Sequence, residues 1–330
     1  MRTKREVPKM LIRSISWGIL LVLVAAVVVP AQLATGKLAE TNRDPKSKFF
    51  DAARLLEDIK YLSSDEMEGR SADRPSMRLV RDYVERRFRE SGIESINGSF
   101  KQEFPITRRN AAPVSGINFV GLIKGKKHAD KYIIVTAHYD HDGIKNGEIY
   151  NGADDNASGT AALFAIASYF KSNQPDHSLI FVAFDAEEKG LVGARHFVAN
   201  LPVAKGSIMV NVNMDMISRS DKGELYAVGT YHYPQLKPVI DAASKKSNIK
   251  LLTGHDDPRL GRDDWTSQSD HAAFHREKIP FIYFGVEDHK DYHKPTDDFA
   301  KIQPEFYVRA VETIIDALRQ VDSSRSPVDG

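Results

Sequence analysis

Short apolar runs alternate with helical stretches from about residue 117 onward. The segment GTAALFAIASYFKS (159–172) predicts a helix. The apolar runs that predict strands lie at residues 118–125, 131–140, 178–188, 206–216 and 279–287. Because these runs are almost continuously apolar, as in strands buried on both faces, we expect an α/β three-layer sandwich. Its central, mostly parallel, twisted sheet would carry helices on both faces.

The stretch before the sheet has a helical pattern. Apolar residues three and four apart form one stripe over residues 55–62 and a second over residues 79–88. The polar stretch SSDEMEGRSADRPS (63–76) between them predicts a loop. We therefore expect a single domain over residues 49–330, with an N-terminal helical region at 49–116 and a polar linker at 32–48 before it.

The first 31 residues differ from the rest. Basic residues up to Arg13 precede an apolar run from Ile15 to Val29, and small residues follow near Ala31. This order is typical of an export signal, and the run is short for a membrane span of about 20 residues. We expect residues 1–31 to be a signal peptide or a membrane anchor through residues 15–29. Either places the body in the periplasm or outside the cell.

The composition restricts which residues could hold a metal ion. The chain of 330 residues is 42% hydrophobic and 28% charged, as in ordinary globular proteins, and its formal net charge of +1 does not indicate a nucleic-acid partner. It contains no cysteine. Disulfides and thiolate chemistry are therefore excluded, and a metal ion would have to be held by His, Asp or Glu. The sequence does not indicate an oligomeric state.

Histidines and carboxylates follow the predicted strands. The candidates that come from separate segments are His138, Asp155, Glu188, Asp215 and His293. In open α/β sheets, ligands bind beyond the carboxyl ends of the strands, so these side chains are expected at one edge. Any one of them alone is more typical of a cap, a turn or a solvated surface residue. Five together indicate a site.

The set fits metal-assisted hydrolysis. Zinc binds imidazole nitrogen and carboxylate oxygen, and two metals about 3.5–4 Å apart need a bridging carboxylate. One bridging Asp with a His and an acid for each metal accounts for all five residues. Asp140 is then placed to hold the second ring nitrogen of His138. Glu187, next to the ligand Glu188, is free to accept a proton from the attacking water as general base.

Six segments carry a resemblance to a known family. They are AHYDH (137–141), NGADDNASGTAAL (151–163), FDAEEKGLVGARHF (184–197), NMDMI (213–217), SQSDHAAF (267–274) and DYHKPTDD (291–298). In this order, over residues 117–320, they resemble the co-catalytic di-zinc aminopeptidases of peptidase clan MH, which include exported bacterial leucyl-type enzymes.

The resemblance implies roles for individual residues. One zinc ion would take His138 and Asp215, the other Glu188 and His293, with Asp155 rather than Asp154 as the bridge. Tyr292 matches a tyrosine that stabilises the oxyanion of the tetrahedral intermediate. Asp297 or Asp298 is expected to orient His293. The pair Asp270–His271 is expected to be structural and to line the pocket.

These expectations combine into one function with two alternatives. The chain would be a zinc aminopeptidase with two Zn²⁺ per chain that releases N-terminal residues from a peptide substrate. The alternatives are a glutaminyl-peptide cyclotransferase of the same fold, which uses one zinc, and an inactive receptor-like ectodomain, which predicts gaps among the ligands. Side-chain preference is expected to depend on loops at 219–232 and 254–266. Trp265 and Phe274 are candidates for an apolar pocket, and residues 262–264 for binding charged substrate ends.

Overall fold

The computed structural model describes residues 45–108 and 111–324. The predicted signal or anchor segment at 1–31 lies outside them, as does most of the predicted linker at 32–48. The helices are α1 (Ala52–Leu62), α2 (Met77–Glu90), α3 (Gly159–Ser172), α4 (Val192–Ala199), α5 (Lys237–Ser244), α6 (His271–Arg276) and α7 (Pro304–Ser323). In this part of the chain, no helix has both the length and the apolar character needed to cross a membrane.

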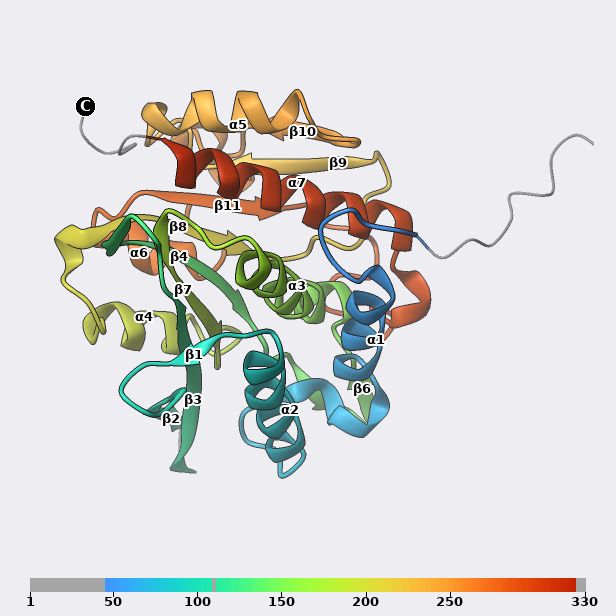
Figure 1. Cartoon of the computed structure of the whole chain (residues 1–330). Helices are drawn as coiled ribbons and strands as arrows, with labels where there is room; N and C mark the ends of the chain where they lie inside the picture. Colours follow the sequence, from blue (N-terminus) through green and yellow to red (C-terminus); the bar gives the residue numbers. More distant parts are fainter. Residues whose placement is uncertain (1–44, 109–110, 325–330) are drawn as a thin grey trace, which may run out of the picture. The chain divides into compact units, whose positions relative to one another are not determined.

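The strands form a central sheet and one small hairpin. The strands of the sheet are β1 (Glu94–Ser95), β2 (Lys101–Arg108), β3 (Ala111–Ile123), β4 (His128–His138), β7 (His177–Phe184), β8 (Ile208–Met214), β9 (Glu224–Val228), β10 (Lys250–Thr253) and β11 (Phe281–Gly285). Strands β5 (Gly143–Lys145) and β6 (Glu148–Tyr150) form the hairpin. The sheet order is β1-β3-β7-β4-β8-β11-β9-β10, with β2 paired to β3 (Figure 1).

The centre of the sheet is parallel, as the apolar runs predict. Strands β7, β4, β8 and β11 pair in parallel, whereas β3 joins β7 and β9 joins β11 in antiparallel fashion. In register, His138 lies beside Phe184, and Phe284 lies beside Met214. The residues that follow Phe184 and Met214 along the chain therefore emerge at the same edge as His138.

Helices cover both faces of the sheet. Alternate β4 residues face opposite ways: Ile133 and Val135 join the core under α1, α2, α3 and α7, and Ile134 joins the core under α4 and α6. Figure 1 shows α3 and α7 running across one face of the sheet. The expected α/β fold with helices on both faces is confirmed.

The structure differs from the expected elements in three places. The region 49–116 is not helical throughout: its α-helices are α1 and α2, and residues 101–108 pair with β3 as an antiparallel strand. The predicted loop at 63–76 contains the short helical turn η1 (Asp65–Arg70). The expected loop at 219–232 contains β9, which pairs with both β10 and β11. Strands β2 and β9 are short or amphipathic and do not form the long apolar runs of the central strands.

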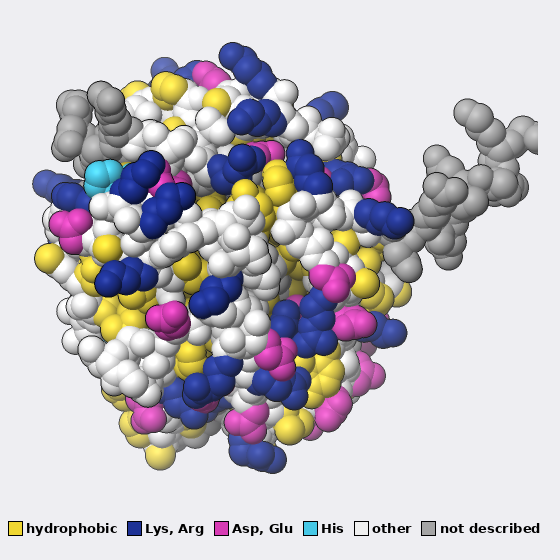
Figure 2. All heavy atoms as spheres, in the orientation of Figure 1, with side chains coloured by type: hydrophobic (Ala, Val, Ile, Leu, Met, Phe, Trp, Pro, Cys, Tyr) yellow, Lys and Arg dark blue, Asp and Glu magenta, His cyan; other side chains and the backbone are white. Residues whose placement is uncertain are grey.

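The remaining short helical turns connect these elements. They are η2 (Ala153–Ser158), η3 (Lys205–Ser207), η4 (Pro234–Leu236), η5 (Pro258–Asp263) and η6 (Phe299–Lys301). Figure 2 shows Lys and Arg side chains spread over the face that carries α3 and α7, with Asp and Glu among them. The charges on this face are therefore mixed in sign.

Gly193 allows α4 to begin close to the end of β7. Its carbonyl accepts a hydrogen bond from Asn118 Nδ2 at 2.9 Å, and Asn118 Oδ1 accepts one from the Asp185 amide at 3.2 Å. A Cβ atom at Gly193 would lie 2.2 Å from the carbonyl oxygen of Asp185. The strand end that leads to Glu187 is thus packed against a backbone position that has no room for a side chain.

We expect Gly193→Ala to destabilise the fold by about 1–3 kcal/mol, the usual cost of overpacking a close contact. The measurement is the midpoint of urea-induced unfolding. Gly206→Ala is the matched control, because no atom lies within 4 Å of a Cβ at Gly206. Equal midpoints for the two variants would show that the α4–β7 contact adjusts without cost.

Candidate metal centre

The five candidate ligands meet at the carboxyl edge of the sheet. His138 ends β4, Asp215 follows β8, Glu188 follows β7, and Asp155 lies in η2. Nε2 of His138 lies 3.3 Å from Asp215 Oδ2 and 3.5 Å from Asp155 Oδ1. Nε2 of His293 lies 3.1 Å from Asp155 Oδ2 and 3.6 Å from Glu188 Oε2. The grouping of the five residues agrees with the sequence prediction.

Asp155 faces both His138 and His293, and Asp154 does not. One Asp155 carboxylate oxygen is near His138, and the other is near His293. Asp154 instead accepts hydrogen bonds from Ser218 at 2.7 Å and contacts His289 Nε2 at 3.1 Å. Because the oxygens of Asp154 have protein partners, Asp155 is the residue of this pair that suits a bridging position.

Several polar atoms of the cluster are buried without a hydrogen-bond partner. They include His138 Nε2, Glu188 Oε1 and Asp215 Oδ1. Buried polar atoms normally have partners, so a group of unpaired ones that face each other fits bound cations. Imidazole nitrogen and carboxylate oxygen together form the donor set that zinc takes. The residues therefore fit the metal ions that the sequence implies.

His141 belongs to the same cluster, although the sequence prediction assigned it no role. Its donor atoms group with those of Asp155 and Glu188, all within 4.8 Å of one another. A second overlapping group contains Asp142, Glu188 and His293. The available signal was the position of His141 three residues after His138, in the same strand-end segment.

The two adjacent glutamates have opposite electrostatic surroundings. Burial raises the pKa of Glu187 well above its usual value; the His138 imidazole opposes this rise, and the acids Asp270 and Asp215 add to it. Burial alone would also raise the pKa of Glu188, but the nearby imidazoles, His141 first, lower it to about 2. Neighbouring acids whose pKa values are pushed apart suit different roles, one as a proton acceptor and one as a permanent anion.

Asp140 supports the site in two ways. Its carbonyl oxygen lies 3.2 Å from His138 Nδ1, and its carboxylate oxygen lies 3.7 Å from the same atom. The carboxylate also accepts backbone hydrogen bonds from Glu187 at 3.0 Å and Glu188 at 3.3 Å. Asp140 therefore lies at the ring nitrogen where the sequence placed it, and in addition positions the glutamate pair.

The expected role of Asp297 or Asp298 at His293 is wrong. The Asp297 carboxylate accepts the backbone amides of Asp154 and Asp155 at 3.0–3.2 Å, and Asp298 caps the amide of Phe299. Asp142 Oδ2 lies 3.7 Å from His293 Nδ1. The loop that carries Asp297 turns towards η2, whereas Asp142, just before the β5–β6 hairpin, lies near His293. Spacing in the sequence does not reveal which of these acids comes close to His293.

Asp270 and His271 lie beside the cluster. His271 Nε2 is 2.9 Å from the Trp265 carbonyl, its ring stacks on Tyr283, and burial lowers its pKa to about 4. Asp270 is fully buried, and burial raises its pKa to about 8. A neutral imidazole bonded to the backbone is consistent with the structural role expected for His271.

Arg70, a fully buried arginine, holds the loops that carry the candidate ligands. Its guanidinium donates hydrogen bonds of 2.5–2.8 Å to the carbonyls of Leu62, Tyr139, Asn151 and Gly152. Burial lowers the pKa of Arg70 to about 10, while nearby carboxylates led by Asp155 favour its charged form. The sequence prediction placed Arg70 in a polar loop and offered no signal for this role.

A narrow cleft of about 80 Å³ opens beside the cluster. Its walls include Met216, Trp265, Tyr283, Val286, Asp288 and Tyr292. Of the two predicted pocket aromatics, Trp265 lines this cleft. Phe274 is instead buried against Phe184 and Phe197. Among residues 262–264, none lines the cleft, and Asp264 bonds to Thr266 in its own loop.

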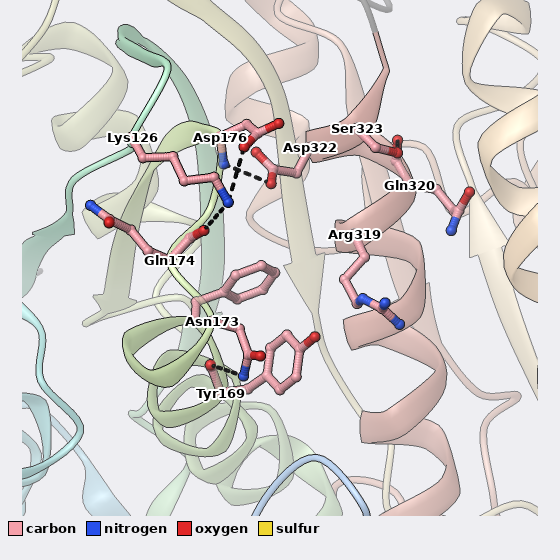
Figure 3. Close-up of a pocket in the computed structure, with 10 residues that line it drawn as sticks. Lys126, Tyr169, Asn173, Gln174, Asp176, Arg319, Gln320, Asp322 and Ser323 are labelled. Carbon is pink, nitrogen blue, oxygen red and sulfur yellow. Dashed lines mark hydrogen bonds and ion pairs between the residues drawn. The ribbon is translucent and has the colours of Figure 1, made fainter.

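A second hollow, of about 440 Å³, lies near the opposite end of β7. Figure 3 shows Lys126 reaching Gln174 and Asp176 there, with Arg319 of α7 on the other side. Lys126 Nζ lies 3.0 Å from the Gln174 carbonyl and 3.2 Å from Asp176, and Asp322 accepts the Asp176 amide. Because these charges pair with one another, this hollow lacks the unpaired converging donors of the metal centre.

Comparison with known proteins points to one family. Residues 118–318 match the family described as Peptidase family M28. Aminopeptidase YwaD of Bacillus subtilis is 32% identical over 215 residues, which is 61% of this chain and 44% of that protein. The chain spans about half the length of the curated relatives it matches.

Solved structures show the same fold at low sequence identity. The chain superposes on glutaminyl cyclase of Porphyromonas gingivalis with a TM-score of 0.66 and 17% identity, covering 82% of this chain and 99% of that one. It superposes on BSAP, a zinc aminopeptidase of Bacillus subtilis, with a TM-score of 0.65 and 19% identity, covering 85% and 97%. At this identity both comparisons show the fold alone and do not identify the reaction.

We expect Arg70→Met to lower the free energy of unfolding by about 3–5 kcal/mol, because buried carbonyls and nearby carboxylates would lose their cation. The measurement is chemical denaturation at neutral pH. Arg78→Met is the control, because Arg78 is exposed on α2 and pairs with Asp82, which is exposed as well. A loss no greater than that of the control would mean that Arg70 does not hold the ligand loops.

Proposed function

The chain belongs to peptidase family M28, and we propose that it is a zinc aminopeptidase that uses two metal ions and the general base Glu187. The observation that carries this proposal is the position of Asp155. One of its oxygens lies near His138 and the other near His293, so a single carboxylate would serve two neighbouring metal positions. A one-metal enzyme has no need of a complete second set of ligands.

The proposed ligands divide between the two positions. His138 and Asp215 would hold one zinc ion, Glu188 and His293 the other, with Asp155 shared between them. Zinc bound at these positions supplies Lewis-acid activation of the attacking water and the scissile carbonyl. The buried unpaired atoms of His138, Glu188 and Asp215 support this assignment.

Glu187 is the proposed general base. Its backbone amide donates a hydrogen bond to Asp140, which fixes its position. Its raised pKa means that it accepts a proton more readily near neutral pH than an ordinary glutamate does. It would accept a proton from the attacking water and return that proton to the amine of the leaving peptide. Its neighbour Glu188, with a pKa of about 2, stays ionised as a ligand throughout.

Tyr292 is the proposed oxyanion donor. It lines the cleft next to His293, with ring centroids 4.2 Å apart, and burial raises the pKa of its hydroxyl. The hydroxyl therefore keeps its proton and can donate a hydrogen bond to the oxyanion of the tetrahedral intermediate. The apolar wall formed by Trp265, Tyr283 and Met216 suits the side chain of an N-terminal residue.

The proposed substrate is a peptide with a free N-terminus, met outside the cytoplasm. Export is proposed from residues 1–31 alone. The glutaminyl cyclase alternative has the same fold. The complete ligand sets on both sides of Asp155 favour the aminopeptidase over a one-zinc cyclase. The inactive ectodomain predicts missing ligands, whereas all five are present.

The deciding experiment measures zinc content and reaction products together. The purified chain is expected to bind about two zinc ions and to release N-terminal residues from aminoacyl-chromophore substrates, with loss of activity on chelation. A peptide with N-terminal glutamine is the control substrate. One zinc ion with ring closure of that glutamine and no cleavage would establish the cyclase instead. A chain without metal would contradict both enzymes.

Substitution of the glutamate pair separates the two roles. Glu187→Gln is expected to keep both zinc ions and to lower kcat by about 100-fold or more, because the proton acceptor is lost. Glu188→Gln is expected to lower zinc content instead, because a charged ligand is lost. Zinc analysis and kcat on the same preparations check this. The reverse pattern would show that the roles of the two residues are exchanged.

A further inference from the structure

His141 is a buried imidazole whose two ring nitrogens lack hydrogen-bond partners. The side chain is fully buried, and neither Nδ1 nor Nε2 makes a hydrogen bond. Burying polar groups without partners costs free energy, so native proteins rarely leave them unpaired. Within the part of the chain that the structure describes, Nδ1 has the carboxylate of Glu188 as a charged neighbour, and neither nitrogen makes a hydrogen bond of good geometry. A bound cation is a suitable partner for a nitrogen that faces carboxylates.

The direction of Nδ1 indicates where such an ion would lie. Nδ1 is 2.7 Å from Glu188 Oε1 and 3.8 Å from Asp155 Oδ2. The shorter distance would suit a hydrogen bond, but the approach lacks the required geometry, and Glu188 Oε1 is itself without a partner. The two atoms, together with a carboxylate oxygen of Asp155, lie within 4.8 Å of one another, close enough to be ligands of one cation.

The ring is held in this position by its surroundings. It packs against Gly152, where an added Cβ would lie 2.5 Å from His141 Cδ2. The His293 ring meets it edge-on, with centroids 5.7 Å apart and an interplanar angle of 89°. The His141 amide donates to the Arg70 carbonyl at 3.2 Å, and Arg70 also holds the Gly152 carbonyl. The framework that places the Asp155 loop thus also places His141.

We infer that His141 is a further protein ligand of the metal position formed by Asp155, Glu188 and His293. This position then has two imidazoles, whereas the position at His138 and Asp215 has one. Because zinc binds imidazole well, the first zinc ion to load enters the position with His141 and is the last removed by a chelator. The inference concerns metal binding and does not depend on which reaction the chain catalyses.

The test measures stepwise zinc affinity of the full-length chain without an activity assay. Zinc is titrated into chelator-treated protein in competition with a chromophoric chelator. His141→Ala is expected to weaken the tighter step by about 100-fold or more, beyond the about 10–100-fold typical of a residue that only orients a ligand. The weaker step should change little. His141→Asn is measured in parallel as a smaller perturbation of the packing.

His177→Ala is the matched control. His177 is also a buried histidine, but it starts β7 at the opposite end of the sheet and contacts Asp322. Thermal unfolding of each variant with zinc and with chelator separates loss of metal affinity from loss of folding. A variant that is destabilised equally with zinc and with chelator, and that retains the tighter zinc step, would overturn the inference.

A spectroscopic measurement distinguishes a ligand from a positioning residue. X-ray absorption of the chain loaded with one zinc ion counts the imidazoles around the metal. The count is expected to fall from about two to about one in His141→Ala. An unchanged count would show that His141 only orients Glu188, and would overturn the inference even if the affinity fell. A chain that binds zinc in this way but cleaves no peptide would leave the inference intact and reject the proposed aminopeptidase.

Discussion

The structure depends on balancing negative charge that is gathered at one buried edge of the sheet. Parallel strands deliver their carboxyl ends to the same edge, and in this chain those ends carry acids. Unpaired carboxylates in a buried site repel one another and cannot all remain ionised without cations. Arg70, the imidazoles and the zinc ions implied by the ligand set together supply the positive charge. The folding of the loops and the metal chemistry are therefore coupled.

Hydrogen bonding assigns the acids at this edge to two tasks. Asp140 and Asp297 accept backbone amides and so hold the segments that carry Glu187, Glu188 and Asp155. Asp215, by contrast, keeps an oxygen without a protein partner. Carboxylates that accept backbone amides support the scaffold, whereas those left without a partner are available to a metal. The same residue type thus serves as support or as ligand according to its neighbours.

The adjacent glutamates show how one dipeptide can carry two functions. Both backbone amides are fixed by Asp140, so the side chains are directed differently from one rigid turn. Glu188 faces imidazoles that lower its pKa, while burial raises the pKa of Glu187 despite its neighbour His138, and Asp270 and Asp215 add to that rise. Asp140 therefore positions both the proposed ligand and the proposed base. The difference between their pKa values arises from the groups that surround each side chain.

The sequence by itself determined the central strands and the types of the candidate metal ligands, because apolar runs and strand-end acids are local signals. The choice of Asp155 over Asp154 rested on the family resemblance. Tertiary structure alone decided the β2–β3 hairpin, the role of Arg70, the place of Asp297 and the presence of His141 in the metal cluster. These features depend on which loops meet at the edge of the sheet. A single residue in a loop has no periodicity, so its contacts are set only when distant segments pack together.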